Sequence, residues 1–191
     1  MVGKDSIISL PDKHLRKRSA KVSALTPELE KIIDDMKTAT LDWEASRPHE
    51  VGVALAAIQI DQPYRIVIVR NNFDDKEDRS FNVYINPEVI KLDGDVEEDY
   101  EGCLSVKDVY GKVPRHSKLR MKALDESGQP IRVRAEGFLA RVLQHEIDHV
   151  NGIVFIDHIK NKPGAFFRLK DDGKLDKLDY EQVKKTGIFR D

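Results

Sequence analysis

The residues with the clearest chemical potential form an H-E-x-x-H run made of His145, Glu146 and His149. If the run is helical, the two histidines lie one turn apart on one face, so both imidazoles can reach the same metal ion. Glu146 then lies beside that ion, where a carboxylate can act as a general base. The pattern predicts a metal-dependent hydrolytic centre.

The third ligand decides what kind of metal site this is, because a catalytic site keeps an open position whereas a structural site closes with four protein ligands. Cys103, the only cysteine in the chain, is the obvious candidate. Two imidazoles and one thiolate suit Fe(II), Zn(II), Ni(II) or Co(II), and do not suit Mg²⁺ or Ca²⁺. Without a metal, Cys103 would be a small buried hydrophobic residue.

Three other uses of the H-E-x-x-H run have to be weighed. The extended zinc-protease pattern H-E-x-x-H-x-x-G-x-x-H is met through Gly152 but fails at Phe155, where it needs a histidine. A structural metal module would recruit His49 or His116 as a fourth ligand and leave Glu146 without a role. A metallo-amidase or peptidase would use the same centre on another small acyl group.

The H-E-x-x-H run falls in a segment with helical periodicity. Phe138, Val142, His145 and His149 follow at i, i+4, i+7 and i+11, which predicts one buried stripe on a helix over residues 138–150. Gly152 is well placed to end that helix in a left-handed conformation. The two histidines therefore face the interior.

The rest of the chain contains segments with helix patterns and segments with strand patterns. Thr26-Pro27 predicts the start of a helix that ends before Arg47-Pro48. Strands are expected over residues 64–70 and 83–90, and a hairpin is expected from residues 119–124 and 131–135. Residues 71–80 read as a charged surface loop, and a short helix is expected near residues 178–185.

Composition limits the class of protein. A chain of 191 residues that is 40% apolar has room for one domain with a hydrophobic core. A net charge of -2 lacks the positive excess that is typical of nucleic-acid-binding proteins, so specific nucleic-acid binding is not expected. We find neither a signal-peptide h-region nor a membrane span, and one cysteine permits no internal disulfide, so the cytoplasm is the expected location.

Three segments closely resemble the signature motifs of peptide deformylases, in the family's order and with similar spacing. They are Gly52-Val53-Ala54-Leu55-Ala56-Ala57-Ile58-Gln59, Glu101-Gly102-Cys103-Leu104-Ser105 and Gln144-His145-Glu146-Ile147-Asp148-His149. The resemblance covers roughly residues 11–158. It implies an α+β domain over residues 1–191, with antiparallel strands packed around the helix that carries H-E-x-x-H, and with residues 161–191 as a variable C-terminal tail.

The resemblance also implies a reaction, the removal of the N-formyl group from the initiator methionine of nascent polypeptides with release of formate. By motif position, Cys103, His145 and His149 would hold the metal, usually Fe(II) in this family, and Glu146 would be the general base. The metal lowers the pKa of water, and Glu146 is placed to take its proton and later deliver one to the leaving amine. The side-chain amide of Gln59 and the backbone N–H of Leu104 would stabilise the developing oxyanion.

Substrate contacts are expected around the same centre. Val53, Phe138 and Val142 are candidates for an apolar methionine pocket, with ordinary core packing as the alternative. Glu101 and Arg115 are expected to pair beside the metal ligands. Ala54 stands where the family usually has a second glycine. Its methyl group would strain a backbone with positive φ, or narrow the substrate groove if φ is negative.

The expected partners are N-formyl-methionyl nascent peptides and, transiently, the ribosome. A monomer with no membrane association is expected. The lysine-rich segment after Lys160 could contact the ribosome or keep the protein soluble, and we favour solubility.

Overall fold

The computed structural model describes residues 2–47, 49–170 and 172–189. Within these residues, seven strands form one sheet in the order β1-β2-β3-β4-β6-β7, with β5 paired to β4, and every pairing between these strands is antiparallel. The strands are β1 (Ala54–Ala56), β2 (Ile66–Arg70), β3 (Phe81–Cys103), β4 (Val106–Leu124), β5 (Pro130–Glu136), β6 (Phe166–Leu169) and β7 (Leu175–Lys177). The α-helices are α1 (Pro27–Ala45), α2 (Gly137–Val150) and α3 (Tyr180–Lys185). The predicted α+β class is confirmed.

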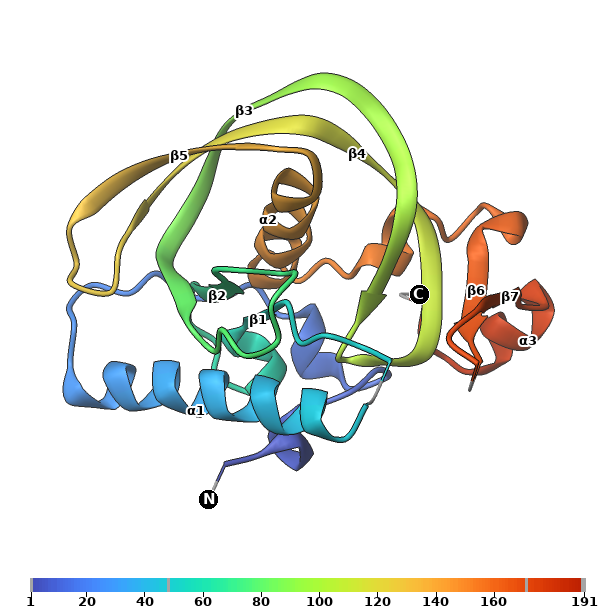
Figure 1. Ribbon diagram of the computed structural model, residues 1–191, viewed down its shortest axis with the longest axis horizontal. Coiled ribbons are helices and arrows are strands. Elements are labelled where there is room, and N and C mark those ends of the chain that lie inside the picture. Colours follow the sequence, from blue (N-terminus) through green and yellow to red (C-terminus); the bar gives the residue numbers. More distant parts are fainter. Residues whose placement is uncertain (1, 48, 171, 190–191) are drawn as a thin grey trace.

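Strands β3 and β4 form a long hairpin that arches over α2 (Figure 1). Their register shifts between Ile85 and Glu88, between Val89 and Lys91, and between Asp93 and Val96. Such bulges bend a strand and increase its twist. Asn86 and Gly94, both with positive φ, lie at two of them. The bulges therefore let the hairpin curve around the helix.

Helix α2 forms where the apolar and histidine periodicity predicts a helix. It runs beneath the arch of β3 and β4 (Figure 1). Its side chains Ala140, Leu143, Ile147 and Val150 are buried in a core with Leu119 and Met121 of β4 and Val67 and Val69 of β2. Gly152 follows the helix with φ 77°, as expected for a left-handed stop.

Strands β1 and β2 are buried on both faces. Val67 and Val69 face the core around α2, whereas Ile66 and Ile68 pack in a second core with α1. This division follows from the two-residue side-chain period of a strand. Helix α1 starts as predicted, with the Thr26 side chain accepting a hydrogen bond from the Leu29 N–H. Helices α1 and α2 thus pack on opposite faces of β1 and β2.

The described residues after α2 pack against the sheet. Short 3-10 turns, Phe155–His158 and Pro163–Ala165, lead into β6, which pairs with β4 at Tyr110 and Gly111. Phe166, Val183 and Ile188 are buried in a third core together with Phe155 and Ile159. The β6–β7 hairpin, called the C-terminal hairpin below, thus belongs to the same sheet that carries Cys103.

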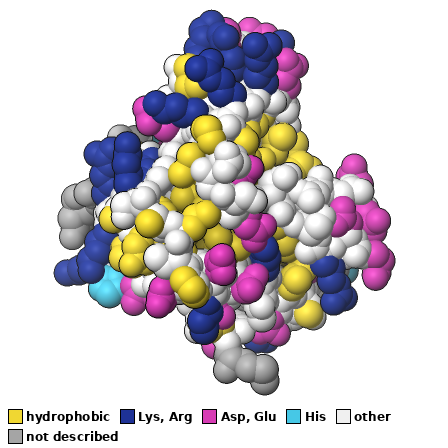
Figure 2. All heavy atoms as spheres, turned by 90° about the vertical axis from the view of Figure 1, so that its left-hand side faces the viewer, with side chains coloured by type: hydrophobic (Ala, Val, Ile, Leu, Met, Phe, Trp, Pro, Cys, Tyr) yellow, Lys and Arg dark blue, Asp and Glu magenta, His cyan; other side chains and the backbone are white. Residues whose placement is uncertain are grey.

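Surface charge follows the outer side of the arch. Lys118, Arg120, Lys122, Arg132 and Arg134 are exposed on β4 and β5. Figure 2 shows Lys and Arg side chains gathered at the top of one face of the molecule, the height at which the arch lies in Figure 1. Among the described residues, no helix is both long and apolar enough to cross a membrane.

Candidate active site and metal centre

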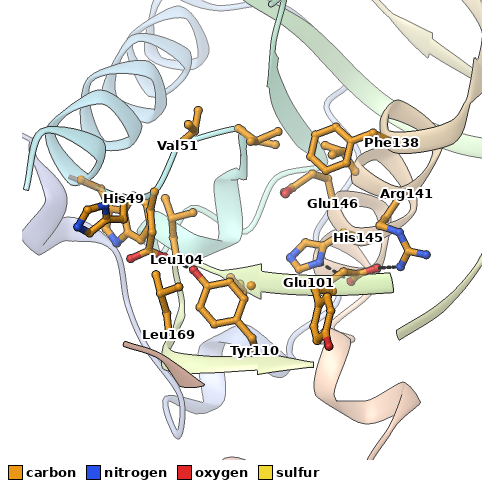
Figure 3. Close-up of a pocket in the computed structure, with 18 of the residues that line it drawn as sticks. His49, Val51, Glu101, Leu104, Tyr110, Phe138, Arg141, His145, Glu146 and Leu169 are labelled. Atoms are coloured by element: carbon orange, nitrogen blue, oxygen red, sulfur yellow. Dashed lines mark hydrogen bonds and ion pairs between the residues drawn. The ribbon is translucent and has the colours of Figure 1, made fainter. Parts of the chain in front are cut away.

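A cavity of about 410 Å³ opens between β1, the end of β3, α2 and the C-terminal hairpin (Figure 3). Its lining brings together all three motif segments, since Ala54, Cys103 and Glu146 each border it. These residues are far apart in the sequence, and the sheet and helix bring them to one place.

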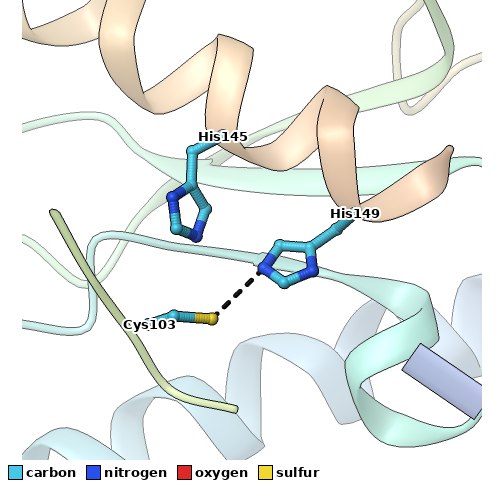
Figure 4. A group of neighbouring side chains, drawn as sticks. All are labelled: Cys103, His145 and His149. Atoms are coloured by element: carbon cyan, nitrogen blue, oxygen red, sulfur yellow. Dashed lines mark hydrogen bonds between the residues drawn. The ribbon is translucent and has the colours of Figure 1, made fainter. Parts of the chain in front are cut away.

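Cys103, His145 and His149 converge at the inner wall of the cavity (Figure 4). Their ligand atoms all lie within 4.8 Å of one another, and Cys103 Sγ is 3.2 Å from His149 Nε2. Both histidines come from successive turns of α2, and Cys103 ends β3. The arrangement can hold one metal ion, because metal bonds of ~2.0–2.3 Å to sulfur and nitrogen span such a gap.

A buried carboxylate orients the first of these histidines. Glu101 Oε2 lies 2.9 Å from His145 Nδ1, which leaves His145 Nε2 to face the cluster. Burial would raise the pKa of Glu101, but the contacts with His145 and Arg115 outweigh it and lower that pKa below its usual value. Glu101 is therefore a fixed anion behind the metal cluster.

The expected contact between Glu101 and Arg115 is a two-pronged pair. Arg115 Nε donates to Glu101 Oε1 at 2.9 Å, and Arg115 Nη2 donates to Oε2 at 3.1 Å. Arg115 Nη1 also donates to Asp148 at 2.5 Å, and Asp148 lies 2.7 Å from His158 Nε2. The network extends from the cluster to a partly exposed histidine.

The pKa values of the two histidines are shifted in opposite directions. Burial lowers the pKa of His145, yet Cys103 and Glu101 together raise it well above its ordinary value. Burial, helped by the charge of His145, holds the pKa of His149 well below its ordinary value. His149 Nδ1 is buried and has no hydrogen-bond partner among the described residues.

Glu146 is buried beside the cluster and faces the cavity. Burial raises its pKa to about 7, although the charge of His145 lowers it in part. Its Oε2 atom is buried without a hydrogen-bond partner among the described residues. A carboxylate with a pKa near neutrality can both accept and return a proton at that pH.

Gln59 and Leu104 border the same cavity. Gln59 Oε1 accepts from the Ala56 N–H at 2.8 Å, which turns its amide nitrogen toward Ser105 Oγ at 3.1 Å and Cys103 Sγ at 3.5 Å. Leu104 lies in the turn between β3 and β4. The amide nitrogen of Gln59 thus points toward Cys103 of the cluster.

The four residues expected to contact substrate all line the cavity: Val53, Ala54, Phe138 and Val142. Val142 is buried, but Phe138 is 51% exposed and packs edge-on against Phe73, so it forms the rim of the cavity and not part of the core stripe. Ala54 is an extended residue of β1 and is not among the described residues with positive φ. The backbone at Ala54 is therefore unstrained, and narrowing of the groove by its methyl group stays a prediction.

The histidines considered as a fourth ligand lie outside the cluster. His49 lines the outer part of the cavity, and the backbone of His116 is hydrogen-bonded to Gln144. Within the described part of the chain, the metal-ligand group contains three residues. Phe155, the residue that breaks the protease pattern, is buried and stacks on the His145 ring. The site keeps an open side, as hydrolysis requires.

Several residues of the cavity were not identified from the sequence. Arg141 is buried and donates to Glu101 Oε1 at 2.9 Å, and its position four residues before His145 was an available signal. Tyr110, Trp43, Leu169 and Leu175 also line the cavity. No local pattern marks these four, because they come from α1, β4, β6 and β7, which meet only in the tertiary structure.

The polypeptide deformylase family model matches residues 4–164. A peptide deformylase of Rhodopseudomonas palustris is 40% identical over 185 residues, covering 95% of each chain. One from Chromohalobacter salexigens is 37% identical over 159 residues, covering 83% of this chain and 87% of the other.

Solved structures agree with these relatives. A peptide deformylase from Synechococcus elongatus in complex with actinonin superposes with a TM-score of 0.74 at 34% identity, covering 82% of this chain and 80% of the other. A deformylase from Legionella pneumophila gives 0.70 at 39% identity, covering 80% and 83%.

Proposed function

Because the chain belongs to the peptide deformylase family, we propose that Cys103, His145 and His149 hold the metal ion for its reaction and that Glu146 is the general base. The protein is a hydrolase that removes the N-formyl group from the N-terminal methionine of nascent polypeptides and releases formate. The main support for these roles is that one sulfur and two imidazole nitrogens converge beside a buried carboxylate at one cavity.

The residues of the cluster fit a divalent transition metal. The thiolate and two imidazoles form a borderline-soft donor set. We propose Fe(II) as the physiological ion, with Zn(II), Ni(II) or Co(II) as substitutes. When bound, the ion supplies Lewis acidity that polarises the formyl carbonyl and makes water nucleophilic at neutral pH.

Glu146 acts first as the general base and then as the general acid of the reaction. Glu146 lines the cavity, and its Oε2 has no hydrogen-bond partner among the described residues, so the carboxylate can take a proton from the attacking water. The same carboxylic acid then delivers that proton to the amine that leaves when the C–N bond of the formamide breaks. A pKa near 7 makes both transfers accessible at neutral pH.

Gln59 and Leu104 stabilise charge on the formyl oxygen. The Gln59 amide is held by the Ala56 N–H and Ser105, so it is positioned before substrate arrives. The Leu104 backbone N–H supplies a second donor. The methionine side chain occupies the apolar part of the cavity bordered by Val53, Ala54, Phe138 and Val142.

We further propose that the protein acts in the cytoplasm as a monomer and contacts the ribosome transiently, since its substrates are nascent chains. The lone cysteine supports a reducing location, because metal ligation requires the free thiolate.

Formate release tests the proposed roles. Metal-loaded, anaerobic protein should hydrolyse a formyl-Met tripeptide rapidly and leave its acetyl-Met counterpart intact. In Glu146→Ala we expect kcat to fall by roughly 10²–10⁴ because the proton acceptor is lost, with the metal content unchanged. Glu30→Ala, an exposed glutamate of α1, is the matched control. Equal hydrolysis of the formyl and acetyl peptides would identify a general amidase, and full activity in Glu146→Ala would remove Glu146 as the base.

A further inference from the structure

The cavity continues beyond the reacting groups to a second, apolar end. Trp43, Leu169 and Leu175 line this end, and Figure 3 shows Leu169 and His49 across the cavity from Phe138 and Glu146. Leu169 and Leu175 belong to the β6–β7 hairpin, which follows the segment matched by the family model. The wall of the cavity here is supplied by the C-terminal part of this chain.

Near its turn, the hairpin has two leucines on the side of the cavity and two charged residues on the opposite side. Leu169 pairs directly with Leu175, whereas the neighbouring pair, Arg168 and Asp176, is exposed. Because side chains alternate along a strand, the two leucines project to the side opposite Arg168 and Asp176. Phe167, on the same side as Leu169, packs edge-on against Tyr100, which also lines the cavity.

The hairpin is held firmly in this position. β6 pairs with β4 at Tyr110 and Gly111, and Phe166 is fully buried. The hydroxyl of Tyr110 donates to Glu50, which also pairs with Arg47 at 3.1 Å. Glu50, which lines this end of the cavity, is therefore already paired with a hydroxyl and a guanidinium, and Trp43, Leu169 and Leu175 supply apolar surface beside it.

We infer that the two leucines and Trp43 form a binding subsite for an apolar side chain in one of the two residues that follow the formyl-methionine. The inference rests on the proposed function, in which the formyl group lies at the cluster and the methionine side chain lies by Phe138 and Val142. The rest of the peptide must then leave along the remaining part of the cavity. Half-buried leucines beside a site contribute binding energy when a ligand covers them.

Selectivity among three peptides tests the subsite: formyl-Met-Ala-Ala, formyl-Met-Phe-Ala and formyl-Met-Ala-Phe. We expect kcat/KM for one phenylalanine peptide to exceed that of formyl-Met-Ala-Ala by about tenfold, the order expected for burying an apolar side chain. In Leu169→Ser/Leu175→Ser this ratio should fall to about 1. The ratio is measured within one preparation, so the fraction of active enzyme does not affect it.

Arg168→Ser/Asp176→Ser changes the adjacent pair on the opposite face and should keep the wild-type ratio. If the double leucine variant does not fold, the single variant Leu175→Ala should lower the ratio in the same direction. Equal kcat/KM for all three peptides in the wild type, or an unchanged ratio in the leucine variants, overturns the subsite. Absence of formate from every peptide would instead contradict the proposed function.

Discussion

At the scale of single residues, Glu101 organises the site through its contact with His145. Its two oxygens contact His145, Arg115 and Arg141, and all four residues are buried. A buried carboxylate with three cationic or hydrogen-bonding neighbours has little freedom to move. It therefore fixes the tautomer and orientation of His145, as residues behind metal ligands commonly do.

Removing the guanidinium of Arg115 should loosen this arrangement. In Arg115→Ala, Glu101 loses two hydrogen bonds and Asp148 loses one, so we expect metal affinity to fall by roughly 10–100-fold, with a matching loss of kcat at limiting metal. Titration with Co(II), followed by its absorption spectrum, measures the affinity directly.

Arg115→Lys is the informative control for that prediction. It keeps the charge but cannot reproduce the two-pronged contact, so its metal affinity should lie between those of the wild type and Arg115→Ala. If Arg115→Ala binds and turns over as the wild type does, the residue has only a packing role.

At the scale of elements, Gly152 determines where α2 ends. Gly152 has φ 77°, and a Cβ atom there would lie 2.5 Å from the carbonyl oxygen of Arg16. The glycine thus serves two needs at once, a left-handed stop and a close approach to the N-terminal segment. Ser19 N–H donates to the Val150 carbonyl at 3.0 Å in the same region.

Gly152→Ala should be distinctly more harmful than an alanine at another left-handed glycine. We expect it to lower the free energy of unfolding by roughly 2–4 kcal/mol, from backbone strain and the clash together. Gly187 has φ 71°, and among the described residues nothing lies within 4 Å of an added Cβ, so Gly187→Ala should cost about 1 kcal/mol. Urea unfolding measures both, and equal losses would show that the contact with Arg16 relaxes easily.

At the scale of the whole molecule, the metal cluster joins two distant parts of the fold. Cys103 lies at the end of the arching hairpin, and His145 and His149 lie on the helix beneath it. A bound ion would bridge them and stabilise the folded state, because the unfolded chain does not hold these three ligands together.

Chelation should therefore lower the Tm of the wild type. A free ion at 100 times its Kd stabilises by about 2.7 kcal/mol, which corresponds to a Tm change of roughly 5–10 °C for a chain of this length. Cys103→Ala should lose the metal and show the same Tm with and without chelator. Unchanged metal content in that variant would exclude Cys103 as a ligand.

The sequence predicted those parts of the fold that depend on local pattern. The starts of α1 and α2, the glycine stop and the β4–β5 hairpin are visible in caps, periodicity and turn residues. It did not predict the length of β3 and β4, where short strands over residues 83–90 and 119–124 were expected. Residues 91–100 lie outside the core, so no apolar alternation marks them, and pairing with β4 makes them a strand.

For the site, the sequence by itself determined the chemistry. His145, Glu146 and His149 predict a metal centre with a neighbouring base because their helical spacing is a local property, and the resemblance to deformylases added Cys103 as the third ligand. Only the tertiary structure decided what surrounds that centre. The buried position of Arg141, the extended backbone of Ala54 and the leucine wall of β6–β7 depend on contacts between segments distant in the chain, and these contacts form only when the sheet closes over α2.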